Sequence, residues 1–194
     1  MIPLSIGDTF QFSCQEQASC FNECCQDLNQ FLTPYDILCL KQRLNLPSNL
    51  FLERYTSQHV GPETGLPVIT LKPDHSQNLK CPFVTAAGCS VYENRPASCR
   101  TYPLIRMASR SRETGKITEQ YFLLKEPHCL GFNEEKSSTV QEWIQDQGLI
   151  VYNQMNDMLM EIISLKNRLM PGQMDIKSKF LFHMACYDLD TFGT

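Results

Sequence analysis

Ten of the 194 residues are cysteines, and eight of them fall into two groups along the sequence. One group lies within residues 11–25 and the other within residues 81–129: Cys14, Cys20, Cys24 and Cys25, then Cys81, Cys89, Cys99 and Cys129. Cysteine thiolates are ligands of zinc and of iron–sulfur clusters. Disulfides are the less favoured reading, because a chain of this length can build a hydrophobic core and cytosolic reductants keep thiols reduced. The two groups therefore indicate a metal-binding protein.

The spacing inside the first group favours a site with more than one metal atom. Cys20 and Cys24 are four residues apart, which places both thiols on one face of a helical turn. Cys24 and Cys25 are adjacent, and adjacent side chains point in different directions in a helix or a strand. Either an irregular loop presents both thiols to one metal ion, or the two thiols serve different metal atoms. We therefore expect a polynuclear or paired site.

The same spacing does not identify the metal. Zinc ribbons and fingers use paired Cys-x2–4-Cys knuckles, and neither group contains two of these. The Cys-x2-Cys-x2-Cys run of bacterial ferredoxins is also missing from the sequence. Eight thiols suffice for two four-thiolate sites, or for one site with the other cysteines structural. An iron–sulfur cluster and zinc are both compatible with this pattern.

Composition excludes several classes of protein. The net charge is −4 and the sequence pI is about 5.6, so no basic surface for nucleic acid is expected. Hydrophobic residues make up 42% of the chain, enough for a packed core. The N-terminal residues lack the basic and apolar regions of a signal peptide, and no apolar run is long enough to span a bilayer. We expect a cytoplasmic protein that does not bind membranes.

Local signals predict the elements that position the cysteine groups. Thr33 and Pro34 form a helix start, with the helix expected to end near Asn45. The β-branched run at residues 66–71 predicts a strand. Residues 104–109 and 117–124 flank a polar turn, which is the pattern of a β-hairpin. The section that carries the cysteines is therefore expected to mix helices and strands.

Helix signals dominate the last third of the chain. Ser138 with Gln141, or Thr139 with Glu142, forms a capping box, and Gly148 is expected to break the helix that follows. Apolar residues then recur at helical spacing to about residue 169, at Val151, Met155, Met158, Leu159, Ile162, Ile163 and Leu169. The predicted fold is α+β: a small metal-stapled cysteine-cluster domain at residues 1–135, with an α-helical C-terminal extension at residues 136–194 packed on it.

The cysteine-bearing stretches resemble the YkgJ-like cysteine-cluster family, which is described as a zinc- or iron-chelating domain with a CxxCxxCC opening. The resemblance covers roughly residues 10–132. The residues that carry it are Phe12 to Cys25, Leu32-Thr-Pro-Tyr-Asp36, Cys81-Pro-Phe83, Gly88-Cys-Ser-Val-Tyr-Glu-Asn-Arg-Pro-Ala-Ser-Cys-Arg-Thr-Tyr-Pro103 and Cys129-Leu-Gly131. The opening departs from the family pattern, with five and three residues between its first three cysteines, and Cys20 is the least direct equivalent.

The resemblance implies an iron–sulfur centre, of the 4Fe–4S type, or zinc, held by all eight grouped cysteines. Bacterial flagellin lysine methylases carry a similar cysteine pattern and use S-adenosylmethionine, so the resemblance also includes methyl transfer among the activities to test. The sequence contains no GxGxxG motif, which leaves a Rossmann-type cofactor site without support.

Residues near the grouped cysteines have competing interpretations. Arg95 and Arg100 flank Cys99 and either offset thiolate charge, as cofactor-binding residues, or only cap a turn through neighbouring carbonyls. His128 precedes Cys129, where an outer-shell or solvent-exposed position is favoured over ligation. The remaining cysteines, Cys39 and Cys186, are expected in the core, because free cysteine is among the most buried residue types.

Three functions from different classes follow from these observations. The leading hypothesis is a protein that holds an iron–sulfur cluster or zinc through cysteine thiolates and supports electron or methyl transfer. The second is a structural zinc module that binds a protein partner. The third is an S-adenosylmethionine-dependent protein methyltransferase, whose catalytic residues the sequence does not identify.

Overall fold

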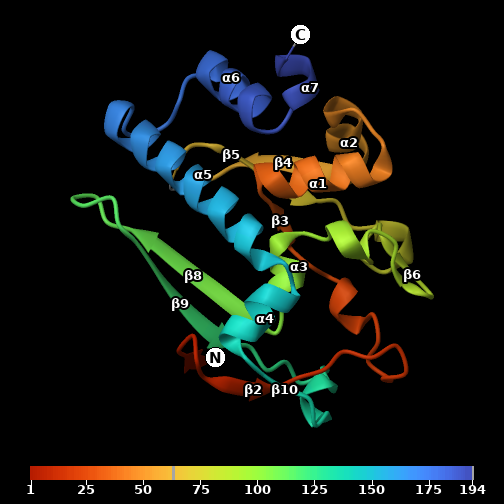
Figure 1. Ribbon diagram of the computed structural model, residues 1–194. Helices are drawn as coiled ribbons and strands as arrows, with labels where there is room; N and C mark the ends of the chain where they lie inside the picture. The colour runs from red at the N-terminus through yellow and green to blue at the C-terminus, as the bar shows by residue number, and fades with distance from the viewer. Residues whose placement is uncertain (63, 194) are drawn as a thin grey trace.

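Seven α-helices and four small antiparallel sheets make up the part of the chain that the computed structural model describes, residues 1–62 and 64–193 (Figure 1). The helices are α1 (Pro34–Leu44), α2 (Ser48–Tyr55), α3 (Ala97–Thr101), α4 (Val140–Asp146), α5 (Leu149–Leu169), α6 (Ile176–Cys186) and α7 (Leu189–Phe192). The strands are β1 (Ile2–Leu4), β2 (Thr9–Gln11), β3 (Phe31–Leu32), β4 (Thr56–Val60), β5 (Pro67–Leu71), β6 (Val84–Thr85), β7 (Gly88–Cys89), β8 (Leu104–Arg110), β9 (Ile117–Leu123) and β10 (Ser137–Thr139). The α+β class predicted from the sequence is confirmed.

Two of the sheets form around elements that the sequence predicted, one hairpin and one single strand. β8 and β9 form the expected hairpin, with Leu104 opposite Leu123 and Arg110 opposite Ile117, and β1 adds to its outer edge. β5 lies between β3 and β4 in a second sheet, where Ile69 is buried. The other two sheets are the short pairs β10–β2 and β6–β7. The β10–β2 pair joins the start of the chain to the segment that enters the C-terminal helices (Figure 1).

Buried apolar side chains form two separate cores. The first core lies around α1, α2 and β5 and contains Leu32, Ile37, Leu40, Phe51, Ile69, Leu71, Phe83, Val91 and Tyr187. The second core lies between the β8–β9 hairpin, β2 and α4 and contains Phe10, Phe12, Leu104, Tyr121, Leu123, Val140, Ile144 and Leu149. Cys81 and Cys89 pack against the first core, and Cys129 packs against the second. The two cores therefore divide the grouped cysteines between them.

Capping residues fix the ends of the helices as the sequence predicted. Thr33 and Asp36 form a reciprocal capping box at the start of α1, Pro34 is the first helical residue, and Asn45 ends the helix in the left-handed conformation. Of the two capping boxes proposed before α4, the structure has the one formed by Thr139 and Glu142. Each box satisfies backbone N–H groups that have no partner within the helix.

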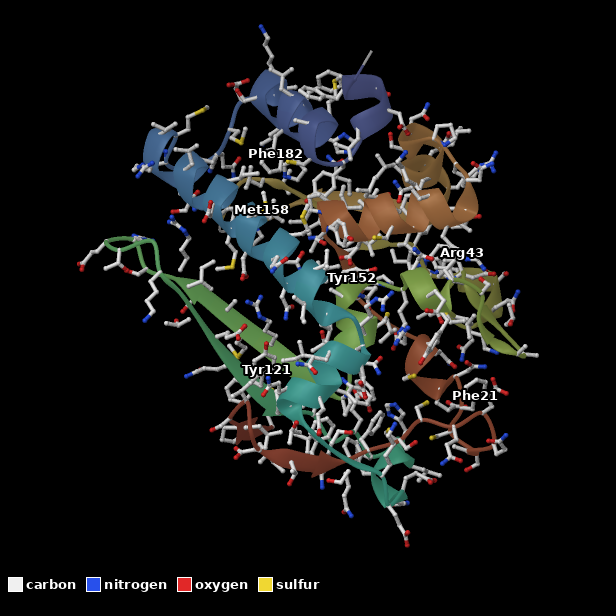
Figure 2. All side chains as sticks on the ribbon, in the orientation of Figure 1. Phe21, Arg43, Tyr121, Tyr152, Met158 and Phe182 are labelled. Carbon is white, nitrogen blue, oxygen red and sulfur yellow. The ribbon has the colours of Figure 1, made fainter. Side chains whose placement is uncertain are left out.

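Helix α5 crosses the molecule diagonally between the β8–β9 hairpin and α1 (Figure 1). Gly148, in the left-handed conformation, breaks α4 from α5 as expected, and α5 ends at Leu169. Tyr152 points into the protein (Figure 2), whereas five of the apolar residues at helical spacing are exposed: Val151, Met155, Met158, Ile162 and Leu169. The face turned inward carries Leu149, Tyr152 and Lys166, whose side chains are buried. None of the helices in the described residues has the length and apolar character needed to cross a membrane.

Candidate metal centre

The loop after β2 brings Cys14 to the segment that contains Cys129. Main-chain N–H groups of Phe12 and Ser13 donate hydrogen bonds to Lys136 O and Gly131 O, at 3.0 and 2.9 Å. Cys129 itself lies at a turn in which its N–H group donates to Glu126 O at 3.0 Å. Two parts of the chain that are far apart in sequence are thus fixed side by side by their backbones.

Cys20 and Cys24 join this pair. The N–H group of Leu130 donates to Sγ of Cys20 at 3.3 Å, and the N–H group of Glu23 donates to the Cys20 carbonyl at 3.0 Å. Burial raises the pKa of the Cys14 thiol, and charge repulsion from Cys24, Cys129 and Cys20 raises it further. Cys14, Cys20, Cys24 and Cys129 are therefore neighbours, and we call them the first thiol group.

A second set of backbone contacts gathers the remaining grouped cysteines. The N–H group of Cys81 donates to the Cys25 carbonyl at 2.8 Å, next to an antiparallel bridge between Gln26 and Lys80. The β6–β7 pair then turns the chain back, so that Cys89 lies opposite Val84. These contacts bring Cys25, Cys81 and Cys89 to one place, although the last two are far from Cys25 in sequence.

Cys99 completes this set from helix α3. The residue is exposed, but its thiol donates to Oε1 of the buried Gln30, with Sγ 3.6 Å from that oxygen. Burial raises the pKa of the Cys99 thiol to about 12, and charge repulsion from Cys81 and Cys89 contributes. Cys25, Cys81, Cys89 and Cys99 are the second thiol group.

Adjacent Cys24 and Cys25 connect the two groups. They end a 3-10 helix, η1 (Glu23–Cys25), in which successive side chains leave the axis about 120° apart. The Cys25 thiol donates to Cys24, which lowers the pKa of Cys24 to about 7 and raises the pKa of Cys25. Charge repulsion from Cys81 and Cys99 also raises the pKa of Cys25. The adjacent side chains therefore leave the helix in different directions, and the contact between their thiols links the two groups.

Backbone N–H groups already point at several sulfur atoms. The N–H group of Val84 donates to the Cys81 carbonyl oxygen at 3.1 Å. Burial raises the pKa of Cys81 and of Cys89, and the backbone N–H groups of Phe83 and Val84 beside Cys81, and of Val91 beside Cys89, favour the thiolate and lower the pKa against that effect. Leu130 provides the matching bond to Cys20. Hydrogen bonds to sulfur stabilise the thiolates that hold zinc and iron–sulfur clusters.

Tyr102 contributes to the first thiol group, and reasoning from the sequence missed it. Its hydroxyl oxygen is fully covered and has no hydrogen-bond partner in the described structure. Burial raises the pKa of this hydroxyl, and the neighbouring Cys129 thiol raises it further. A buried polar group without a partner costs about 1–3 kcal/mol, and a Cys129 thiolate would accept its hydrogen bond. The only sequence signal was its position three residues after Cys99.

The donor chemistry of both thiol groups fits zinc or an iron–sulfur cluster. Across residues 1–62 and 64–193, however, no three Cys, His, Asp or Glu side chains converge tightly enough to hold a metal ion as they stand. All ten cysteines are free, and the pKa shifts of Cys14, Cys25, Cys81, Cys89 and Cys99 favour protonated thiols, which repel one another less than thiolates. Metal binding would displace those protons.

The two arginines that flank Cys99 have different surroundings. Arg95 donates to Tyr92 O and to Oε1 of Gln147, and its charge lowers the pKa of Cys89 and of Cys99 against the larger effect of burial. Arg100 donates to three carbonyl oxygens, those of Arg95, Glu93 and Gln147. Arg95 thus lies where it can offset thiolate charge, and Arg100 ties α3 to the turns around it.

The residues set aside in the sequence analysis have other surroundings, although His128 adjoins Cys129 and Cys186 packs on the same core as Cys81 and Cys89. Cys39 is buried next to Tyr35 and Tyr152; burial raises the pKa of both tyrosine hydroxyls, and the Cys39 thiol contributes. Cys186 packs against the first core. His128 lies 3.7 Å from Glu126, measured between Nε2 and Oε2.

Comparison with known protein families gives one match. The CxxCxxCC family model, whose description is "Putative zinc- or iron-chelating domain", matches residues 13–137. All eight cysteines of the two thiol groups lie inside the matched region, and Cys186 lies outside it. Neither the comparison with curated proteins nor that with solved structures gave a match.

Proposed function

Because the chain belongs to the CxxCxxCC family of zinc- or iron-chelating domains, we propose that it holds its metal through the cysteines of the two thiol groups. One observation carries this proposal: hydrogen bonds from Ser13 to Gly131, from Leu130 to Cys20 and from Cys81 to Cys25 bring together cysteine-bearing segments that are spread from residue 14 to residue 129. Such a concentration of free thiols has little value for packing alone, because the members of each group repel one another when ionised. Bound metal removes that repulsion.

An iron–sulfur cluster would supply one-electron chemistry, and zinc would supply structural stability. We propose the iron–sulfur form, with electron transfer as its use, as the first to be tested. Adjacent Cys24 and Cys25 support it over a simple zinc knuckle, because a polynuclear or paired centre can use both thiols.

Anaerobic purification of the full chain, followed by metal and acid-labile sulfide analysis, tests this proposal. Iron and sulfide in similar amounts, with visible charge-transfer absorption that bleaches on reduction, are the expected result. Zinc without sulfide would instead support the structural module for protein interaction. Protein that holds neither metal after reconstitution would contradict metal binding by these thiols.

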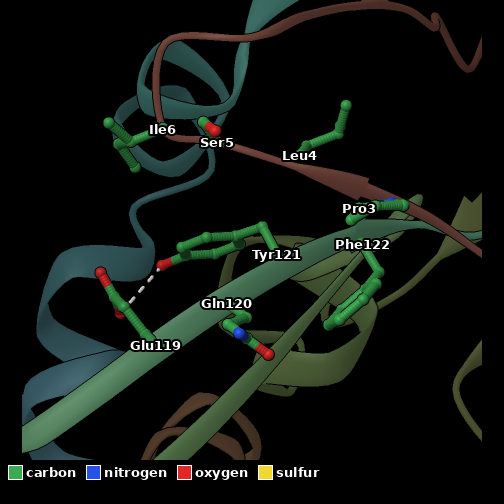
Figure 3. Close-up of a pocket in the computed structure, with 8 residues that line it drawn as sticks. All are labelled: Pro3, Leu4, Ser5, Ile6, Glu119, Gln120, Tyr121 and Phe122. Carbon is green, nitrogen blue, oxygen red and sulfur yellow. Dashed lines mark hydrogen bonds between the residues drawn. The ribbon is translucent and has the colours of Figure 1, made fainter.

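Methyl transfer finds less support in the described structure. Two of the surface hollows bear on this alternative, and the larger of these two, with a volume of about 720 Å³, lies between the N-terminal residues 3–6 and β9 (Figure 3). It is lined by Glu119 and Tyr121, whose side chains hydrogen-bond at 3.1 Å, and by no cysteine. The smaller hollow, beside α1, is also lined without a cysteine. Calorimetry of the metal-loaded protein with S-adenosylmethionine tests this alternative directly.

A further inference from the structure

We propose that the two thiol groups are two separate metal centres: the first held by Cys14, Cys20, Cys24 and Cys129, the second by Cys25, Cys81, Cys89 and Cys99. This inference rests on the proposed function, because it assumes that the thiols bind metal. It adds that the chain binds two metal ions or clusters, and it assigns four ligands to each. The alternative is one centre, with the remaining cysteines structural.

The backbone supports the two groups by independent contacts. The first group depends on the hydrogen bonds from Ser13 to Gly131 and from Leu130 to Cys20, at 2.9 and 3.3 Å. The second depends on the hydrogen bond from Cys81 to Cys25, at 2.8 Å, and on the β6–β7 pair. Cys129 packs on one hydrophobic core, whereas Cys81 and Cys89 pack on the other. One group can therefore be disturbed without loss of the framework that holds the other.

Helix η1 divides the adjacent cysteines between the centres. The start of this helix is held to Cys20 of the first group by the hydrogen bond from Glu23 N–H to the Cys20 carbonyl, at 3.0 Å, and its end is held to Cys81 of the second group by the hydrogen bond from Cys81 N–H to the Cys25 carbonyl, at 2.8 Å. The turn at η1 starts at Asn22, which is held in the left-handed conformation with φ 69°, and Nδ2 of Asn22 donates to Thr85 O at 3.0 Å. That hydrogen bond ties η1 to β6, so the direction of the two thiols is set by tertiary contacts.

Each centre also has its own means of stabilising charge. Four thiolates around Zn²⁺, or around a 4Fe–4S cluster in its oxidised state, carry a net charge of roughly −2. Arg95 lies close enough to Cys89 and Cys99 to offset that charge at the second centre. The first centre has hydrogen-bond donors instead: the N–H group of Leu130 and the unpartnered hydroxyl of Tyr102 beside Cys129. Tyr102 is therefore a positioning residue for the first centre, because its hydroxyl would donate a hydrogen bond to a Cys129 thiolate.

Titration of the metal-free full chain with Co²⁺ under anaerobic conditions tests the inference. Tetrahedral cobalt thiolates have intense visible bands, so the titration counts sites and reports the ligand type. We expect the unaltered chain to take up two Co²⁺ ions. The variants Cys14→Ser and Cys81→Ser should each keep one, and Cys186→Ser, the matched control outside both groups, should keep two.

The outcomes separate this inference from the proposed function. Saturation of the unaltered chain at one Co²⁺ ion would overturn the two-centre assignment and leave metal binding intact. Loss of both ions in a single-cysteine variant that retains its helical circular dichroism would overturn it as well. Absence of cobalt thiolate bands in every form of the chain would contradict metal binding itself. Because the count on the unaltered chain needs no variant, a cysteine variant that fails to fold does not prevent a decision.

A second measurement concerns Tyr102. In the Cys81→Ser background, where the first centre alone remains, Tyr102→Phe should weaken Co²⁺ affinity roughly 10-fold and shift the thiolate charge-transfer band, as loss of an outer-shell partner does. In the Cys14→Ser background the same substitution should change neither quantity. Equal effects in both backgrounds would show that Tyr102 acts only on the stability of the fold.

Discussion

Gly131 offers the sharpest test of how the fold positions the first thiol group. It begins the 3-10 helix η4 (Gly131–Asn133), two residues after Cys129, and it is buried. A Cβ added at this residue would lie 2.6 Å from Cε2 of Phe12 and 2.9 Å from the Ser13 carbonyl oxygen. Gly131→Ala therefore forces apart the two segments that carry Cys14 and Cys129.

The Phe12 ring has little room to move away from this methyl group. It is 4% exposed, and its centroid lies 5.7 Å from that of Tyr102, 5.2 Å from that of Phe132 and 5.6 Å from that of Trp143. Overpacking of this kind destabilises by about 1–3 kcal/mol. Replacing glycine by alanine also stiffens the unfolded chain, which returns about 0.4–1 kcal/mol. We expect a net loss of about 1–2 kcal/mol in the free energy of unfolding.

Urea unfolding of the metal-free protein measures this loss, and cobalt titration measures its effect on the site. Gly7→Ala is the matched control, because a Cβ there meets no atom within 4 Å. We expect Gly7→Ala to change stability by less than about 0.5 kcal/mol and to leave metal content intact. Gly131→Ala should weaken binding at the first thiol group alone. If both variants unfold at the same urea concentration and bind equal metal, the argument from Phe12 and Ser13 is wrong.

Three further predictions address the framework and the limits of the site. Arg100→Lys should lower the free energy of unfolding in urea by about 2–3 kcal/mol, because one ammonium group cannot serve the three carbonyl oxygens that the guanidinium binds; an unchanged midpoint would contradict this. Thr139→Ala should lower the thermal stability by about 1 kcal/mol, through loss of the α4 cap. Hydrogen bonds from Thr139 lower the pKa of Glu142 below its ordinary value of 4.5, so the stability that this carboxylate provides is present above pH 4.5 and is lost as the pH falls through its lower folded pKa. The stability difference between the unaltered chain and Glu142→Gln, followed by thermal unfolding, should therefore shrink in acid, and a constant difference would refute the capping role. Cys186→Ser should leave the iron or zinc content of the purified protein unchanged, because Cys186 belongs to neither thiol group. Loss of metal in this variant would show that a ligand lies outside both groups.

The sequence by itself determined the features that depend on near neighbours. The capping box of Thr33 and Asp36, the end of α1 at Asn45 and the β8–β9 hairpin were predictable, because each is encoded within a few residues. The set of eight candidate cysteines also came from the sequence, because eight of the ten cysteines fall into two groups along the chain. Cys39 was set aside because it lies on the apolar face of α1, where the structure has it buried. These predictions required no knowledge of how distant segments pack.

Only the tertiary structure decided which cysteines lie together. Cys129 lies beside Cys14, and Cys81 beside Cys25, because of backbone hydrogen bonds between segments far apart in the chain. Spacing along a sequence does not encode such pairings, which depend on how the loops close and which core each segment joins. The approach of Tyr102 to Cys129 has the same origin. Helix α5 shows the same limit: the sequence predicted the helix and its end near Leu169, but five of the seven apolar residues expected on its buried face are exposed, and Tyr152 is buried instead.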